Sequence, residues 1–268
     1  MSDPDPEGFA DGRLTLRRAE VATLTLHAPA TRNAMTRAMW EALPGICGSI
    51  SADPGIRVLI VTGAGDTVCA GADISEFAAV YATRDAAAAY NAAVRAGQAA
   101  LRGVAQPVLA LIRGACVGGG CGIALACDLR FAGQSAVFAI TPAKLGIAYS
   151  PADTAQLIEK VGPARAKDIL FSARKIDATE ALSIGLIDRL CPDQSLAQSV
   201  GDYAQMLTQV SPASLRVTKA TVNALCSVPG AAAIDLETVE REIAALFSGP
   251  DFAEGRAAFM ARRKPVWP

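Results

Sequence analysis

The sequence of 268 residues is 51% hydrophobic, enough to bury the core of one large domain or of one domain with an appendage. Its formal net charge of −1 gives no basic footprint for nucleic acid. No apolar run reaches the roughly 18 residues of a membrane span. The acidic N-terminus also lacks the apolar core of a signal peptide. We therefore expect neither a nucleic-acid nor a membrane partner.

Cysteine and histidine usage argues against several reaction classes. The seven cysteines are an odd number without a C-x-x-C pair, so we predict no disulfide framework, no metal site and a reduced, cytosolic chain. The single histidine, His27, ends an alternating stretch just before Pro29, and we predict a strand-end residue without a catalytic role. The sequence therefore argues against a hydrolase triad, which needs a histidine base, and against a zinc enzyme, which needs several His or Cys ligands.

Strands and helices alternate through roughly the first 190 residues, which predicts an α/β fold. Alternating residues predict a hairpin from 14–16 and 21–26, and helical spacing predicts a helix over 35–51. Continuous apolar runs predict buried strands at 57–62 and 107–112. The other elements expected in this half are an alanine-rich helix at 86–101, a small-residue helix at 123–126 and a strand at 128–132.

The remainder of the chain is mainly helical in pattern. Ser150 before Pro151 is typical of a helix start, Pro163 opens another helix, and Asp177 begins a sequence resembling a capping box. The later expected elements are a helix end at Gly185, a short strand at 186–190 and helices at 196–210, 212–226, 231–247 and 252–263. We predict a flexible leader at 1–12, an α/β core at 13–205 and a C-terminal helical region at 206–268.

Two glycine-rich segments, 61–74 and 113–122, each follow a predicted buried strand. Glycine lets a ligand approach the main chain closely, and in the second segment the glycines fall where a helix begins and its N–H groups are free. For a single glycine cluster, close packing of a helix on a strand is the more common explanation. Neither segment matches a dinucleotide or P-loop pattern. Because the segments occur together and in this order, they favour a shared ligand site.

At this point the sequence resembles the crotonase, or enoyl-CoA hydratase/isomerase, superfamily from about Arg13 to Pro265. The motifs that carry the resemblance are Arg32-Asn33-Ala34-Met35, the segment from Thr62-Gly63 to Cys69-Ala70-Gly71-Ala72-Asp73-Ile74, the glycine-rich run from Gly114 to Asp128, and Thr179-Glu180-Ala181-Leu182-Ser183-Ile184-Gly185-Leu186-Ile187-Asp188. The resemblance implies a crotonase-like spiral of strand–strand–helix units. It also implies a C-terminal helical region that assembles a homotrimer or a dimer of trimers.

The resemblance assigns roles to individual residues. The backbone N–H groups of Ala72 and Gly119 would form a two-amide oxyanion hole for the thioester oxygen. No permanent cofactor is implied, because coenzyme A arrives as part of the acyl-CoA thioester. The residues expected along the coenzyme A channel are Arg32, Ala34, Ala70, Asp73, Ile74 and Gly118, with Lys264 reaching a phosphate across a subunit interface. A solvated arginine at Arg32 and a solvated basic tail at Lys264 are alternatives.

The sequence departs from the family where hydratases carry two glutamates. The first position is Gly122 and the second is Pro142, so both carboxylates are absent. Neither residue can transfer a proton, whereas general acid–base catalysis contributes about 10²–10⁴ in rate. Plain hydration is therefore in doubt.

The stretch Thr141-Pro142 followed by Leu145-Gly146 and Tyr149 resembles the methylmalonyl-CoA decarboxylase branch of the superfamily. In that branch a tyrosine at this position lies near the substrate carboxylate, which makes Tyr149 a catalytic candidate. The match is partial, because the branch carries a histidine where this chain has Ala72. A buried tyrosine that only hydrogen-bonds the backbone is the alternative.

Three other acidic residues lie near the predicted pocket: Asp153 as a helix cap or an acid, Asp73 as a turn residue, and Glu76 facing the acyl chain or solvent. The favoured interpretation is an acyl-CoA enzyme of the enoyl-CoA hydratase/isomerase type that stabilises a thioester enolate. The alternatives are a decarboxylase-like enzyme and a non-catalytic acyl-CoA-binding protein.

Overall fold

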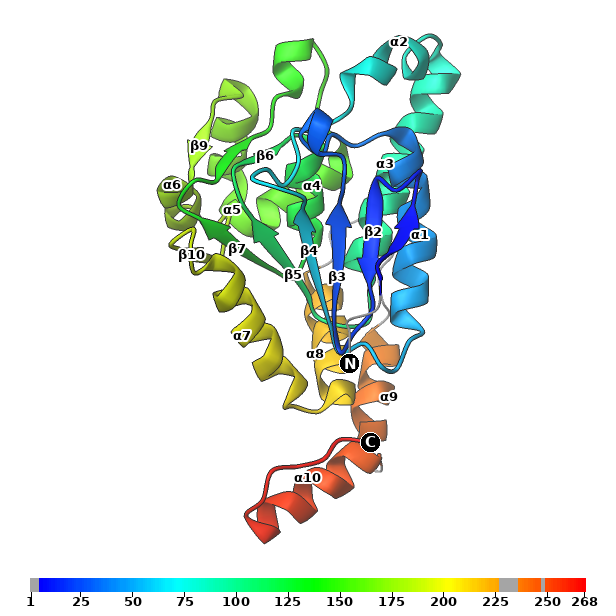
Figure 1. The fold of residues 1–268 in the computed structure, drawn as a ribbon, viewed down its shortest axis with the longest axis vertical. Helices are drawn as coiled ribbons and strands as arrows, with labels where there is room; N and C mark the ends of the chain where they lie inside the picture. Colours follow the sequence, from blue (N-terminus) through cyan, green and yellow to red (C-terminus); the bar gives the residue numbers. More distant parts are fainter. Residues whose placement is uncertain (1–4, 227–235, 247–248) are drawn as a thin grey trace.

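The computed structural model describes residues 5–226, 236–246 and 249–268 (Figure 1). Within these residues a seven-stranded sheet has the order β1-β2-β3-β4-β5-β7-β10. Pairing is antiparallel from β1 to β3 and parallel from β3 to β10. This sheet, with helices on both faces, confirms the predicted α/β fold. The strands are β1 (Glu7–Phe9), β2 (Leu14–Arg17), β3 (Val21–Leu26), β4 (Val58–Gly63), β5 (Val108–Ile112), β7 (Leu129–Gly133) and β10 (Arg189–Cys191).

Successive residues of β4 face two different apolar clusters. Val58 and Ile60 pack with α7 (Leu196–Thr208), whereas Leu59 and Val61 belong to the large core beneath α1 (Arg37–Ser51) and α3 (Arg84–Arg102). Both faces of the strand are therefore dry, which explains why its sequence is a continuous apolar run rather than an alternating one.

A second sheet of three strands lies beside the first, within the described part of the chain. β6 (Ala115–Val117) pairs parallel with β8 (Val137–Ala139), which pairs antiparallel with β9 (Ile176–Asp177). The sequence prediction missed these strands because each has only two or three residues, too few for an alternating pattern. The helix α4 (Gly119–Ala126) starts directly after β6 and packs against β6, α3 and α5.

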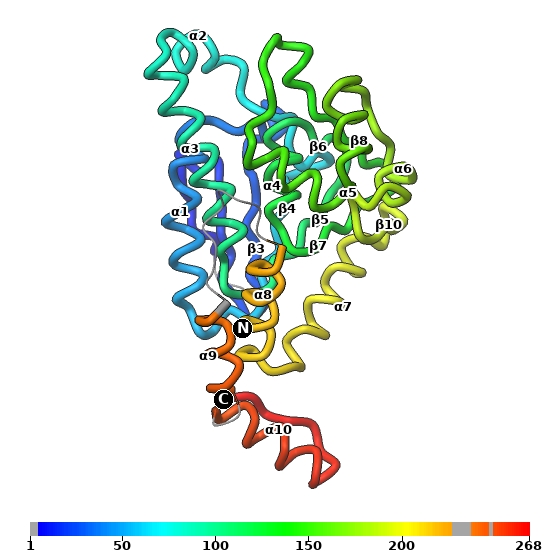
Figure 2. The backbone as a smooth tube through the Cα atoms, turned by 180° about the vertical axis from the view of Figure 1, so that it is seen from behind, coloured from blue at the N-terminus to red at the C-terminus, as the bar shows by residue number. Residues whose placement is uncertain are grey.

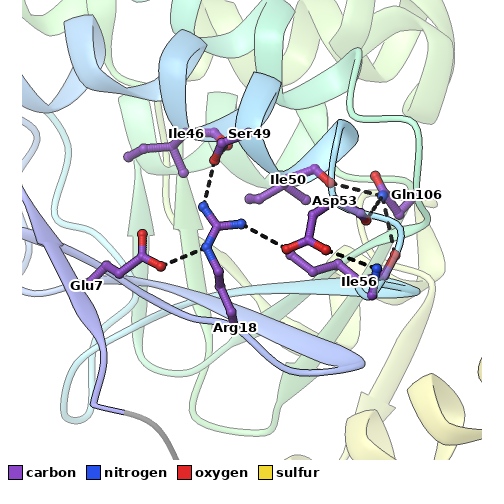
Figure 3. A network of polar contacts seen from close by, with 9 residues as sticks. Glu7, Arg18, Ile46, Ser49, Ile50, Asp53, Ile56 and Gln106 are labelled. Carbon is purple, nitrogen blue, oxygen red and sulfur yellow. Dashed lines mark hydrogen bonds and ion pairs between the residues drawn. The ribbon is translucent and has the colours of Figure 1, made fainter.

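Residues 7–12 correct the predicted leader. Glu7–Phe9 form β1 and extend the edge of the main sheet. Figure 3 shows why this edge is held: Nε of Arg18 lies 2.7 Å from Oε1 of Glu7, and its other nitrogens contact Ser49 and Asp53 at the end of α1 at 2.8 and 3.3 Å. One guanidinium thus joins strand β1 to helix α1. Residues 1–4 of the predicted leader lie outside the described residues.

The middle helices begin where the sequence indicates. The side chain of Ser150 accepts from the N–H of Asp153 at the start of α5 (Pro151–Ser172), and Asp177 caps α6 (Ala178–Ser183). Gly162 interrupts the helical backbone of α5, so a new helix opens at Pro163 as predicted. The remaining short elements are η1 (Pro29–Thr31), η2 (Ile74–Glu76), α2 (Phe77–Val80) and η3 (Pro142–Leu145).

The predicted strand at 186–190 begins three residues late, as β10 at Arg189. The N–H groups of Leu186 and Ile187 donate to the carbonyl of Ala181 at 2.8 and 3.3 Å, and so close the turn after α6 instead of joining the sheet.

The C-terminal helices α8 (Pro212–Leu225), α9 (Leu236–Leu246) and α10 (Pro250–Ala261) extend away from the sheet (Figures 1 and 2). The predicted boundary near residue 205 falls inside α7, whose Ala204 still packs in the sheet cluster. Two parts of the predicted helix at 231–247, residues 231–235 and 247, lie outside the described residues. Large apolar side chains on these helices, Leu225, Phe259 and Met260, are 68%, 85% and 79% exposed in the single chain.

Candidate active site

The loop after β4 presents the N–H of Ala72. Met35 pairs with this loop as in a parallel sheet: its N–H donates to Gly71 at 2.8 Å, and its carbonyl accepts from Asp73 at 2.9 Å. In such a bridge the polar groups of the residue in between, Ala72, point away from the paired strand. The N–H of Ala72 has no acceptor within the described residues.

The second loop presents the N–H of Gly119, the first residue of α4. Gly118 before it has φ 51° and ψ −112°, a conformation that favours glycine, and its own N–H donates to Ala139 at 2.8 Å. An N–H in the first helical turn has no partner in its own helix and lies at the positive end of the dipole.

The two loops lie against each other. The N–H of Cys69 donates to Ala115 at 3.0 Å, and the N–H of Val117 donates to Cys69 at 2.9 Å. A Cβ atom built on Gly119 would lie 4.0 Å from the carbonyl carbon of Gly71, the atom bonded to the nitrogen of Ala72. Free amides from two separate segments are therefore neighbours, which is the arrangement that stabilises a developing oxyanion.

The side chain of Asn33 holds the loop after β4 in place through three hydrogen bonds. Its side chain is fully buried, accepts from the N–H of Ala28 at 2.9 Å, and donates to the carbonyls of Ala64 at 2.9 Å and Thr67 at 2.6 Å. It joins the Arg32–Met35 motif to the turn after β4. Sequence reasoning placed this stretch along the coenzyme A channel and missed the structural role of its asparagine.

At Gly122, where hydratases of the family carry their first glutamate, the neighbouring space is occupied by a side chain from another helix. A Cβ atom built on Gly122 would overlap Nε2 of Gln98, from α3, and lie 3.7 Å from Oη of Tyr149. Pro142, at the second position, begins η3. The region one helical turn beyond Gly119 therefore holds a carboxamide and a phenol in place of a carboxylate. Gln98 was not predicted, because nothing in an alanine-rich helix marks it.

The phenol of Tyr149 hydrogen-bonds no backbone group in the part of the chain that the structure describes, so the alternative role given to it from the sequence is not supported. Its Oη is buried without a hydrogen-bond partner within the described residues. Burial, and then the negative charge of Asp153, raise the pKa of the Tyr149 phenol well above its usual value, so it stays protonated and is a donor.

Asp153 is both a cap and a buried carboxyl. Its N–H donates to Oγ of Ser150 at 3.1 Å, and Oγ donates to Oδ2 of Asp153 at 2.6 Å. Its Oδ1 is buried and has no hydrogen-bond partner among the described residues. Burial raises the pKa of Asp153, opposed by the hydroxyl of Ser150, the carboxamide of Gln98 and the charge of Arg95. Asp153, Gln98 and Tyr149 therefore form one polar cluster.

The other two acidic candidates have structural partners. Oδ1 of Asp73 accepts from the N–H of Ser75 at 3.0 Å and from its hydroxyl at 2.7 Å, which holds the turn into η2. Oε2 of Glu76 accepts from the N–H of Arg37 at 2.7 Å, at the start of α1.

The residues expected along the coenzyme A channel are only partly brought together. Arg32 is exposed, and its carbonyl accepts from the N–H of Ala70 at 3.0 Å; Ile74 is exposed and Ala34 buried on the same loops. Lys264 is exposed and follows α10, which lies at the end of the molecule opposite these loops (Figure 1). A single chain therefore does not join Lys264 to this site.

Six of the seven cysteines are buried and all are free; His27 is exposed directly after β3, at the strand end as predicted. Burial raises the pKa of Cys69, next to the oxyanion loops, to about 12. In the described residues no group of three or more His, Cys, Asp and Glu side chains is placed to hold a metal ion. No helix among those residues is long and apolar enough to cross a membrane.

The sequence profile described as enoyl-CoA hydratase/isomerase matches residues 17–268. The chain belongs to this family. It is an enzyme family that acts on acyl-CoA thioesters, as the motifs around Ala72 and Gly119 predict.

Relatives within the family carry different activities in their names. The chain is 30% identical to a short-chain-enoyl-CoA hydratase of Clostridium acetobutylicum, over 92% of this chain and 94% of the relative. It is 29% identical to a mevalonyl-coenzyme A hydratase of Aspergillus fumigatus, over 92% and 91% of the two chains. The structure of an enoyl-CoA hydratase/carnithine racemase from Magnetospirillum magneticum aligns with a TM-score of 0.89 and 35% identity, covering 96% and 95%.

Proposed function

We propose that this family member binds an acyl-CoA with its thioester oxygen between the N–H groups of Ala72 and Gly119, and stabilises the enolate that forms there. The observation that carries the proposal is the pair of neighbouring free amides from two loops. Negative charge moves onto the thioester oxygen as an enolate forms, so two preorganised donors lower that barrier more than they favour the ground state.

Decarboxylation is a second candidate, supported by Tyr149. In this reaction the bond from the α-carbon to the carboxylate breaks, CO₂ leaves, and the electron pair forms the enolate. One proton donor to the α-carbon then suffices, and no base must activate water. The protonated phenol of Tyr149 lies beside the first missing carboxylate position, as such a donor requires. Hydration is less well supported, because Gly122 and Pro142 replace both glutamates.

A substrate panel tests the reaction. Purified protein is offered crotonyl-CoA, a 3-enoyl-CoA and methylmalonyl-CoA, with products followed by mass spectrometry. We expect turnover of at least one thioester. Coenzyme A thioester binding without turnover would instead favour a non-catalytic binding protein.

Two variants at Gly119 test the oxyanion hole. Gly119→Pro deletes the N–H at the first helical position, where proline is tolerated, and Gly119→Ala keeps it. In both, the new Cβ meets Cζ2 of Trp40 at 3.0 Å, so the alanine variant controls for this contact. We expect turnover about 10²–10³-fold lower for proline than for alanine. Equal rates in the two variants would rule out the Gly119 amide as a donor.

We further propose that coenzyme A enters along Arg32, Ala70 and Ile74, and that the chain assembles as a homotrimer or a dimer of trimers. The exposed apolar side chains of α8 and α10 support assembly through the C-terminal helices. Such assembly would give Lys264 a route to a neighbouring subunit's coenzyme A. Sedimentation equilibrium of the full chain should give the mass of three or six subunits.

A further inference from the structure

The polar cluster beyond the oxyanion loops contains more hydrogen-bonding capacity than the chain itself uses. Gln98 and Asp153 are only 3% and 6% exposed. Oη of Tyr149 and Oδ1 of Asp153 are buried without hydrogen-bond partners among the described residues. Buried polar groups are almost always paired, so unpaired ones at one place indicate a missing ligand or water.

The cluster of Gln98, Tyr149 and Asp153 presents hydrogen-bond donors on the side that faces Gly122. The hydroxyl of Ser150 donates to Oδ2 of Asp153, and the other side chains that act on the pKa of this carboxyl are Gln98 and Arg95 of α3. The negative charge of Asp153 attracts the amide nitrogen of Gln98, which is the atom nearest Gly122. Because Oδ1 of Asp153 is unpaired within the described part of the chain, that carboxyl holds neither hydrogen of this nitrogen, and both can meet a ligand. Together with the phenol of Tyr149, this nitrogen offers two donor groups on the side of Gly122.

The distance of the Gln98 and Tyr149 donors from Gly119 decides which part of a bound acyl group they would contact. Gly122 lies one turn after Gly119 on α4, and its N–H donates to Gly118 at 3.1 Å. A thioester oxygen held at Gly119 therefore places the next carbons of the acyl group near Gly122. Donors beside Gly122 match an acceptor oxygen on the acyl chain and offer nothing to a plain alkyl group.

We propose that Gln98, with Tyr149, is a specificity-determining residue that selects acyl-CoAs carrying an acceptor oxygen, carboxylate or ketone, on the β-carbon. This inference rests on the proposed enolate site, since the thioester must lie at Ala72 and Gly119. It assigns a donor function to the space in which hydratases carry their first carboxylate. Simple saturated acyl-CoAs lack an oxygen there and leave both donors unpaired, which disfavours their binding.

The test compares three thioesters: malonyl-CoA, acetoacetyl-CoA and butyryl-CoA. Their binding is followed by rapid-mixing tryptophan fluorescence, because Trp40 lies against Gly119. We expect the wild type to bind the two β-oxygen thioesters at least about ten-fold more tightly than butyryl-CoA. A preference for malonyl-CoA alone assigns the oxygen to a carboxylate, and one for acetoacetyl-CoA alone to a ketone. Equal affinity for all three thioesters would overturn the inference.

Two variants assign the preference to Gln98. Gln98→Leu removes the donors at similar size and should abolish the preference. Gln98→Glu keeps the size, replaces donors by acceptors, and should make malonyl-CoA bind more weakly than butyryl-CoA. A preference that persists in either variant, with wild-type melting temperature, rejects the role of Gln98. The Gly119 pair tests the enolate site separately: equal turnover in Gly119→Pro and Gly119→Ala rejects that site instead. A Gly119 effect without a β-oxygen preference rejects only the specificity role.

Discussion

Gly119 and Gly122 lie one turn apart on α4 and differ in what surrounds them. Around Gly119, two loops paired through Cys69, Met35 and Val117 leave free backbone N–H groups side by side. Around Gly122, the chain replaces a carboxylate with the carboxamide of Gln98 from another helix. Backbone donors depend on loop geometry and tolerate changed side chains, whereas proton transfer depends on one side chain. The proposed oxyanion site therefore does not by itself fix which reaction the chain catalyses.

The largest effect should come from restoring the carboxylates. A variant with Gly122→Glu, Pro142→Glu and Gln98→Ala supplies both acids and clears the space now filled by Gln98. Because acid–base catalysis contributes about 10²–10⁴, we expect crotonyl-CoA hydration at least about 10²-fold above wild type, followed by loss of enoyl-thioester absorbance. The control carries Gln at 122 and 142 with the same Gln98→Ala change. No gain over this control would show that the two regions differ in more than these acids.

The hydrogen bonds of Asn33 give the next largest effect. Asn33→Ala removes three hydrogen bonds and leaves the N–H of Ala28 and the carbonyls of Ala64 and Thr67 without them. We expect a loss of about 3 kcal/mol in the free energy of unfolding by urea titration. Asn91→Ala, at an exposed position of α3, should change it by less than about 0.5 kcal/mol. Similar small losses in both variants would contradict this role of Asn33.

Alanine substitutions at two helical glycines distinguish the effect of side-chain packing on stability from the effect of helix propensity. Gly122→Ala forces its Cβ against Gln98 and should lower the free energy of unfolding by about 1–3 kcal/mol. Gly201→Ala in α7, where a Cβ meets nothing within 4 Å, should raise it by about 0.5–1 kcal/mol. Thermal and urea unfolding measure both. A stabilising alanine at Gly122 would mean that Gln98 moves away freely.

The smallest effect concerns Asp153 and pH. Its pKa is raised in the folded state, so ionisation costs stability above the folded pKa, and this cost disappears as pH falls below the unfolded value of 3.8. Asp153→Asn removes the ionisation, with each unit of pKa shift equal to about 1.4 kcal/mol. Urea unfolding from pH 4 to 7 should therefore show the variant gaining relative to wild type as pH rises. A difference in unfolding free energy between variant and wild type that does not change with pH would argue against a raised pKa of Asp153.

The main sheet was predictable because its signals are local, and local motifs also marked the two residues of the proposed oxyanion hole. Apolar runs gave β4 and β5, caps at Ser150 and Asp177 gave helix starts, and the motifs gave Ala72 and Gly119 as candidates. What brings those two residues together is pairing between Cys69 and Cys116, far apart in the chain and without a local pattern.

The polar cluster was only half visible in the sequence. Tyr149 and Asp153 stood in a motif and a helix start, whereas Gln98 is one polar residue in an alanine-rich helix. Its importance arises from the packing of α3 against α4, which no local pattern reports. The short strands β6, β8 and β9 were missed for a related reason, because their identity comes from pairing with one another.

The uneven burial of the cysteines has a practical consequence. Cys226, at the end of α8, is the exposed thiol of the seven, and the others lie in the interior. A maleimide dye under native conditions should therefore attach at one place on the single chain, next to Leu225 of the proposed assembly surface. Assembly through α8 should protect this thiol, so the rate of labelling would follow the association of the chains.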